Sequence, residues 1–323
     1  MPDPTLDIAS LGGHTMGTQW SARLVLPRHR DLHPLHAGIQ AQLDGVVAQM
    51  STWEPGSDIS RFNRAAAGSW HVLPEGFFQV LETAVDVARR SDGAFDPSIG
   101  PLVALWGFGA HARQPRLPSP EALAAVAARC GWQRLQLRAE SRQALQPGGL
   151  ELDLSAIAKG FGVDQASRWL RAAGITAALV EVGGELHGYG SKPDGQPWRV
   201  LVEPGPDEDA LDAPPRVLAL DGLAVATSGD RWHHHDIDGQ RYSHTLDPRS
   251  ARPVPHATAA VTVIAPTAME ADAWATVLTV MGAAEGLAFA TTHDLAARFV
   301  SRSAEGIVET LSPAFVRHLD ASA

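Results

Sequence analysis

The sequence predicts an α+β protein in which mixed or antiparallel sheets are flanked by helices. Segments with the alternation of a β-strand and segments with helical periodicity are both frequent along the 323 residues. They do not follow the regular βαβ order of a dinucleotide-binding sheet, which favours α+β over α/β. A composition of 45% hydrophobic and 19% charged residues is ordinary for a globular protein. A chain of this length can bury a large core, in one domain with two lobes or in two domains.

Helices are expected where apolar residues recur every three to four positions. Residues 35–50 show this most clearly, because Leu35, Ile39, Leu43, Val46, Val47 and Met50 fall on one face. Residues 77–90 form a second helix, a short one opens at Pro118 and runs to about Arg129, and a long one covers residues 269–281.

Strands are expected where apolar and polar residues alternate between turn-forming residues. Residues 18–26 are the first, preceded by Gly12, Gly13 and Gly17, which we interpret as turn residues. Residues 135–137 and 150–154 are expected to pair around the turn at 147–149. Further strands are expected at 177–184, 198–203, 217–226 and 259–265, a short one begins at Arg241, and helix and strand alternate over 285–315. The acidic, proline-rich segment 204–215 is expected to be an exposed loop.

The charge and the cysteine content exclude several classes of function. A formal net charge of -10 argues against a nucleic-acid partner, which would require a basic face. Cys130 is the only cysteine, so neither an intrachain disulfide nor a cysteine-rich metal site is possible, and we expect a half-buried thiol at a helix end. The motifs GxGxxG, P-loop and GxSxG are absent.

The N-terminus has no basic region followed by an apolar one, and no later segment is expected to be long enough to cross a membrane. We therefore expect no transmembrane segment and a cytoplasmic location for the chain as written. The location would be periplasmic or membrane-anchored if a leader was removed.

The stretch LDLSAIAKGFGVD, residues 152–164, is expected to lead from a buried strand into a helix. It brings the carboxylate of Asp153, the hydroxyl of Ser155 and the ammonium of Lys159 to a helix entrance. Free backbone N–H groups and the helix dipole favour a phosphate there, and a lysine adds positive charge. An ordinary capped helix with Lys159 in solvent explains this stretch equally well on its own.

Two further places carry side chains suited to chemistry. Asp272 and Thr276 lie one helical turn apart and present hard oxygen ligands of the kind that Mg²⁺ accepts; a solvated helix face is the alternative. His244 stands between a strand and a proline turn, where it could meet a ligand or be structural. His233, His234 and His235 are consecutive and point in different directions, so we interpret them as a surface loop and not as a metal site.

Eight stretches, in this order, resemble the ApbE family of FAD:protein FMN transferases. They are HTMGT (14–18), STWEPGSDISRFN (51–63), DGAFDPSIGPLVALWGFG (92–109), LDLSAIAKGFGVD (152–164), VEVGGELHGYGSKPDGQPWRVLVE (180–203), ATSGDR (226–231), YSHTLDPRSARPV (242–254) and MEADAWATVL (269–278). The resemblance covers nearly the whole chain and implies a single two-lobed domain over residues 1–323. It implies Mg²⁺-dependent transfer of FMN from FAD to a threonine or serine hydroxyl of an acceptor flavoprotein, with release of AMP.

Matching positions carry the family's site residues over to this chain. The resemblance implies that FAD lies among Met16, Trp53, Ala94, Phe95, Asp96, Asp153, Lys159 and Leu246. It implies that the carbonyl of Ala156 and the side chains of Asp272 and Thr276 hold Mg²⁺, and that His244, Asp272 and Lys159 are catalytic. His244 is the favoured base toward the acceptor hydroxyl, and Asp272 is the alternative.

The chain also departs from the family's pattern. Trp53 stands where tyrosine is common, His233–His235 replace a more aromatic stretch, and Trp274 replaces a small aliphatic residue. These departures bear on substrate preference and on docking of the acceptor. Two alternatives stay open, an FAD pyrophosphatase that releases FMN and AMP, and an FAD-binding protein without turnover.

Overall fold

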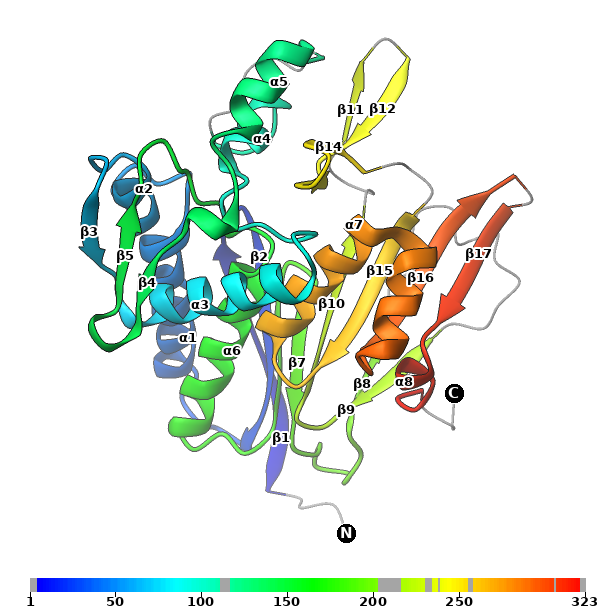
Figure 1. The fold of residues 1–323 in the computed structure, drawn as a ribbon. Coiled ribbons are helices and arrows are strands. Elements are labelled where there is room, and N and C mark those ends of the chain that lie inside the picture. The colour runs from blue at the N-terminus through cyan, green and yellow to red at the C-terminus, as the bar shows by residue number, and fades with distance from the viewer. Residues whose placement is uncertain are drawn as a thin grey trace.

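The computed structural model describes residues 5–110, 117–202, 216–229, 234–237, 239–254, 258–304 and 306–319. Its centre is an eight-stranded sheet in the order β1-β2-β6-β7-β10-β15-β16-β17 (Figure 1). Every neighbouring pair in this sheet is antiparallel. The strands are β1 (Leu6–Thr15), β2 (Thr18–Pro27), β6 (Ala178–Val182), β7 (Glu185–Tyr189), β10 (Leu223–Gly229), β15 (Thr258–Ala265), β16 (Ala296–Ser303) and β17 (Gly306–Leu311).

Helices cover one face of this sheet. α1 (His33–Met50) and α6 (Ala158–Ala172) pack on β2 and β6, and α7 (Ala268–Thr292) packs on β10 and β15, with α3 (Glu75–Arg90) beside it (Figure 1). The opposite face is covered by the hairpin of β8 (Trp198–Leu201) and β9 (Val217–Leu220) and by α8 (Pro313–Val316). The predicted α+β class, with antiparallel sheets flanked by helices, is confirmed.

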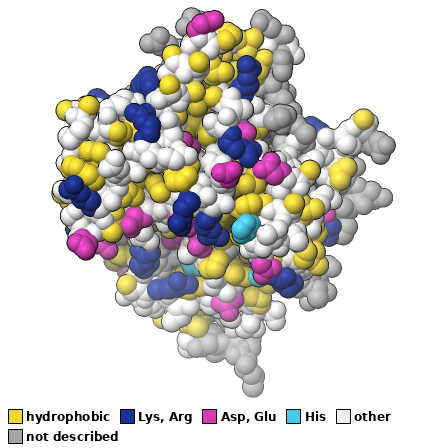
Figure 2. Space-filling model, in the orientation of Figure 1, with side chains coloured by type: hydrophobic (Ala, Val, Ile, Leu, Met, Phe, Trp, Pro, Cys, Tyr) yellow, Lys and Arg dark blue, Asp and Glu magenta, His cyan; other side chains and the backbone are white. Residues whose placement is uncertain are grey.

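Smaller elements surround one end of the sheet. A second sheet is formed by β3 (Ser69–Val72), β5 (Gln143–Gln146) and β4 (Leu137–Arg138), next to α2 (Asp58–Asn63). Above them in Figure 1 lie α4 (Gly100–Leu105), α5 (Pro120–Ala127), the hairpin of β11 (His234–Ile237) and β12 (Gln240–Ser243), and the pair of β13 (Leu246–Asp247) and β14 (Arg252–Pro253). On the face drawn in Figure 2, basic and acidic side chains are interspersed.

Two strand predictions near the sequence motifs were wrong. Residues 150–154 alternate like a strand but pair only through one bridge, between Glu151 and Ile99; the strand that pairs with β4 is β5. Gly12 and Gly13, interpreted as turn residues, lie inside β1. A Cβ atom on Gly13 would lie 2.6 Å from Nε1 of Trp20, so glycine is required there for close packing.

Further predictions concerned the consecutive histidines, the loop 204–215, Cys130 and membrane-spanning segments. His234 and His235 lie in the hairpin strand β11, not in a loop, and His233 lies outside the described residues, as does the predicted loop 204–215. Cys130 is half-buried near the end of α5, as predicted. The expectation that no segment is long enough to cross a membrane was wrong for α7, which is long and apolar enough by length and composition. Its residues 268–280 are mostly buried inside the molecule, which is typical of a core helix.

Candidate active site

The first turn of α6 and the first half of α7 touch backbone to backbone. A Cβ atom on Gly160 would lie 2.1 Å from the carbonyl oxygen of Ala268, so only glycine allows this approach. Asp164, one turn further along α6, fixes the start of α7, because its two carboxylate oxygens accept the N–H groups of Ala268 at 2.9 Å and Met269 at 3.0 Å. A carboxylate at a helix N-terminus is favourable for the dipole of α7.

This contact frees one backbone carbonyl of the predicted metal site. In a regular helix the Gly160 amide would donate to the carbonyl of Ala156, four residues earlier. Here it donates to Oδ2 of Asp272 at 3.1 Å. Throughout the described part of the chain no hydrogen bond reaches the Ala156 carbonyl. Asp272 and that carbonyl therefore meet at the junction of α6 and α7, although they are far apart in the sequence.

Thr276 lies one turn after Asp272 and is half-buried. The other threonines of α7, Thr279, Thr291 and Thr292, donate to carbonyls four residues earlier. Thr276 makes no such bond within the ranges that the structure describes, so its hydroxyl is available. A carboxylate, a carbonyl and a hydroxyl suit Mg²⁺, which accepts hard oxygen ligands and keeps several waters. No group of three or more His, Cys, Asp or Glu side chains suited to a metal occurs in the described ranges, and this donor set contains only one such side chain.

Lys159 and Glu185 form an ion pair next to Asp272. Burial lowers the pKa of Lys159, but the negative charges of Asp272 and Glu185 raise it by more. The pKa of Lys159 is therefore raised above its usual value. Burial raises the pKa of Asp272, against the effects of Lys159 and of the Gly160 amide. The alternative of a solvated Lys159 is wrong, because its side chain is 32% exposed and paired with a buried carboxylate. Sequence reasoning missed Glu185, because a glutamate directly after Gly183 and Gly184 has the pattern of an exposed turn residue.

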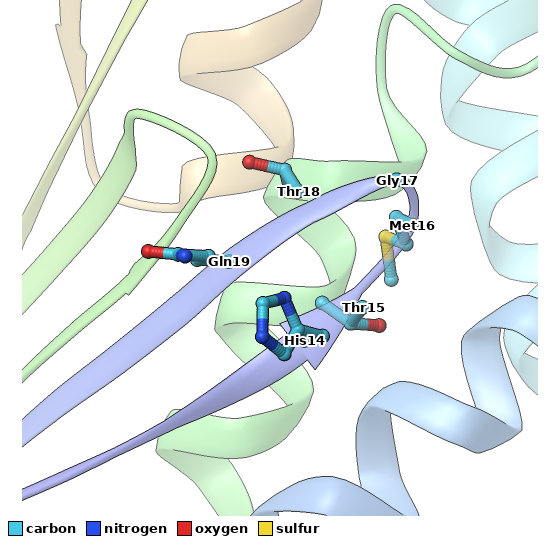
Figure 3. A pocket seen from close by; sticks show the side chains of 6 residues that line it. All are labelled: His14, Thr15, Met16, Gly17, Thr18 and Gln19. Carbon is cyan, nitrogen blue, oxygen red and sulfur yellow. The ribbon is translucent and has the colours of Figure 1, made fainter.

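The hairpin turn between β1 and β2 borders this cluster. Met16 (φ 49°) and Gly17 (φ 72°) are both left-handed, as a tight two-residue hairpin requires. His14 to Gln19 line a depression of about 460 Å³ (Figure 3). The Met16 side chain lies against α6, since a Cβ on Gly162 would be 3.0 Å from its Cε. The Thr15 hydroxyl is buried with no hydrogen-bond partner in the described part of the chain.

The remaining predicted FAD residues lie on the other side of residues 152–157. Trp53 is 68% exposed, and its neighbour Thr52 lines a narrow cleft with Asp153. The Asp153 amide donates to the Pro97 carbonyl at 2.9 Å, which joins residues 94–97 to this segment. The Asp153 side chain is half-buried and accepts the Ser155 amide at 2.9 Å.

Ala94, Phe95 and Asp96 are buried. The side chains of Ala94 and Phe95 belong to the main core, and their amides donate to the Ser91 carbonyl at 3.2 Å and to the Ser91 hydroxyl at 3.3 Å. Asp96 accepts the amide and the hydroxyl of Ser98 at 2.8 and 2.7 Å and the Trp132 amide at 3.2 Å. Burial raises the pKa of Asp96, while these hydrogen bonds oppose the rise. Its carboxylate therefore organises the loop, and a role toward FAD stays a prediction.

His244 follows β12 and lies near α4. Its ring is 6.4 Å from that of Phe108, at an interplanar angle of 69°. His235 stacks on the same Phe108 ring at 4.2 Å and shares a hydrogen bond with the Gly107 carbonyl at 3.0 Å. Because Phe108 also lines the cleft that contains Asp153, His244 belongs to this side of the site. Leu246 is buried with Leu102, Trp106 and Ala251, so a contact with FAD through its side chain is disfavoured.

Comparisons with known proteins show the family to which the chain belongs. The family model described as "ApbE family" matches residues 16–299. A protein of Klebsiella pneumoniae (strain 342) named FAD:protein FMN transferase is 36% identical over 316 residues, which cover 97% of this chain and 89% of that protein. The protein of the same name from Escherichia coli (strain K12) is 35% identical over 313 residues, which cover 96% of this chain and 88% of the relative.

Solved structures give the same result. The apo form of the Pseudomonas stutzeri flavinyl transferase ApbE superimposes with a TM-score of 0.90 at 37% identity, covering 98% of both chains. The flavin transferase ApbE from Vibrio cholerae superimposes with a TM-score of 0.88 at 34% identity, covering 97% of this chain and 100% of the other. With a family match over most of its length and this fold, the chain belongs to the ApbE family.

Proposed function

We propose that this protein is an Mg²⁺-dependent FAD:protein FMN transferase that moves FMN onto a threonine or serine hydroxyl of an acceptor flavoprotein. The names of its relatives support flavin transfer. The observation that supports Mg²⁺ dependence is the junction of α6 and α7. There the Gly160 amide donates to Asp272 and leaves the Ala156 carbonyl available. Ala156, Asp272 and Thr276 would hold the ion, and Lys159 stands beside them.

The reaction breaks a phosphoanhydride bond of FAD and forms a phosphoester bond to the acceptor. The acceptor oxygen attacks the phosphorus on the FMN side of the FAD pyrophosphate, the bond to the bridging oxygen breaks, and AMP leaves. Such a transfer depends on alignment and on neutralising the phosphate charge, with little covalent work for the protein. When bound, Mg²⁺ would polarise the pyrophosphate oxygens.

Side chains of this protein supply the remaining functions. Lys159 adds positive charge for the leaving phosphate, because its raised pKa keeps the ammonium protonated. His244 accepts the proton of the acceptor hydroxyl, and Asp272 is the alternative base. Trp53, exposed beside the cleft, offers a flat surface for the isoalloxazine ring.

One incubation separates this function from a pyrophosphatase and from a binding protein. Pure protein is mixed with FAD and Mg²⁺, with and without a flavin-free domain of a flavoprotein that carries covalent FMN on a threonine. A transferase releases AMP only with the acceptor and leaves flavin fluorescence on the acceptor band in a denaturing gel. AMP and free FMN without acceptor indicate a pyrophosphatase. Bound FAD without AMP in either sample indicates a binding protein.

The role of His244 needs a separate measurement. If it is the base, His244→Asn lowers the transfer rate by about two to four orders of magnitude, the usual effect of losing a general base, while FAD affinity changes little. A loss of affinity in proportion to the rate would make His244 a binding residue and transfer the role of base to Asp272.

A further inference from the structure

Glu185 occupies a rigid position at the first residue of β7. It directly follows the two-residue turn Gly183 (φ 60°) and Gly184 (φ 106°), across which Val182 pairs with Glu185. The Gly183 amide donates to the Gln19 carbonyl at 3.0 Å, and a Cβ on Gly183 would lie 2.8 Å from the Thr18 side chain. The turn is therefore packed against the hairpin that carries Met16, and Glu185 cannot shift without moving it.

The side chain of Glu185 is nearly completely buried, with 3% exposed, and its partner Lys159 is on α6. One carboxylate oxygen, Oε1, accepts from the Lys159 ammonium. The other, Oε2, is buried without a hydrogen-bond partner in the part of the chain that the structure describes. A buried carboxylate is costly unless it is paired, so this arrangement requires a reason beyond packing.

Lys159 is held by Glu185 and not by Asp272. Within the described ranges its ion pair is with Glu185 alone, while Oδ2 of Asp272 is engaged by the Gly160 amide. A lysine ammonium has three donors, so one bond to Glu185 leaves two for phosphate oxygens. Since the lysine side chain is long and flexible, a fixed acceptor on the neighbouring strand determines where its charge lies.

We propose that Glu185 is a positioning residue for FMN transfer, which holds the Lys159 ammonium in place for the leaving phosphate. This inference rests on the proposed function, in which Lys159 neutralises that phosphate. Glu185 acts through Lys159 and does not itself contact the reacting atoms.

A double-mutant cycle tests this coupling. Transfer is measured for Glu185→Gln, Lys159→Met and the double variant, with FAD, Mg²⁺ and the flavin-free acceptor domain described above. Glu185→Gln should lower kcat by about 10–100-fold, the usual effect of losing a residue that orients a functional group, with the KM for FAD changed less than about threefold. The double variant should be no slower than Lys159→Met alone within about twofold, because Glu185 has no other route to the reaction.

Glu309→Gln is the matched control. Glu309 is also a carboxylate of the large sheet, half-buried on β17, with a side chain 10% exposed and bonds to Arg216 and Arg298. It should lower the melting temperature but leave kcat unchanged, which separates lost stability from lost positioning.

The possible outcomes are distinct. If Lys159→Met transfers FMN at the wild-type rate, the proposed role of Lys159 fails. If Lys159→Met is slow but Glu185→Gln is as fast as wild type, or if their effects multiply in the double variant, the positioning role of Glu185 is refuted. A drop in kcat for Glu309→Gln equal to that for Glu185→Gln would also refute it.

Discussion

Replacing Gly160 by alanine tests the close approach of α6 and α7 directly. The added methyl group would lie 2.1 Å from the Ala268 carbonyl oxygen and 2.7 Å from the Met269 nitrogen, whereas ordinary contacts begin near 3.4 Å. The helices would have to separate by about 1 Å. The obstructing atoms are backbone that Asp164 holds by two hydrogen bonds, so they cannot swing aside like a side chain.

The expected cost follows from two opposing effects. Overpacking a rigid contact typically costs 1–3 kcal/mol, and alanine in place of glycine inside a helix returns about 1 kcal/mol. Because backbone is the obstacle, we expect the upper end and a net loss of about 1–2 kcal/mol. For a chain of 323 residues that lowers Tm by roughly 1.5–3 °C. The rate of FMN transfer should fall by more than the loss of stability explains. Separating the helices moves Gly160 away from Asp272 and disturbs the Ala156 carbonyl.

Gly45→Ala provides the control, since Gly45 lies within α1 and a Cβ there would meet no atom within 4 Å. That variant should gain about 0.5–1 kcal/mol and keep full activity. Thermal unfolding by circular dichroism and FMN transfer are measured for both variants. If Gly160→Ala is as stable and as active as Gly45→Ala, the helices do not approach as closely as described, and the argument for the free carbonyl fails.

Three further predictions concern the metal, the flavin and pH. Asp272→Asn keeps an acceptor for the Gly160 amide but loses the negative charge. Mg²⁺-dependent transfer should therefore fall at least about 100-fold, while FAD affinity, measured by fluorescence titration, stays within about threefold of the wild type. Transfer at the wild-type rate would show that Asp272 is not a metal ligand. Trp53→Ala should weaken FAD binding about 2–12-fold more than Trp53→Phe, since stacking contributes roughly 0.5–1.5 kcal/mol beyond buried area; equal affinities would make Trp53 a loop residue only. Burial, and then Arg171, lowers the pKa of His187 to about 4, so its contribution to stability is complete above pH 6.5 and is lost as pH falls toward 4. Between pH 7 and pH 4 the free energy of unfolding, measured in urea, should therefore fall by about 2–3 kcal/mol less for His187→Leu than for the wild type. Equal decreases in the two proteins would contradict a neutral buried ring.

The sequence predicted the pairing of Asp272 with the start of α6 through resemblance, but it missed Glu185. A glutamate that follows two glycines at the start of a strand has the pattern of an exposed turn residue. Its burial arises only because α6 crosses β7 there, which depends on contacts between segments distant in sequence. Local patterns carry no information on such a crossing.

The error at residues 150–154 has a similar origin. Leu150, Leu152 and Leu154 are all fully buried, as the alternation predicted. The backbone hydrogen bonds, however, go to a side chain and a loop: Leu152 exchanges two bonds with the amide of Asn63, at 2.8 and 2.9 Å, and Asp153 donates to Pro97. Alternation reports which side chains are buried, and it does not identify the partner of the backbone.

The same distinction explains the form of the candidate site. Asp272 was visible as a carboxylate one turn before Thr276, yet its effect depends on a backbone N–H of another helix. Gly160 lets α7 approach, Asp272 takes the amide that Ala156 would otherwise bind, and the carbonyl of Ala156 is left available as a ligand. An available carbonyl has no signature in side-chain patterns, because every residue has one and only the fold decides which is unpaired. Gly160, in a helix where alanine would be more stable, indicates the close approach of another segment, and it does not reveal which carbonyl is unpaired.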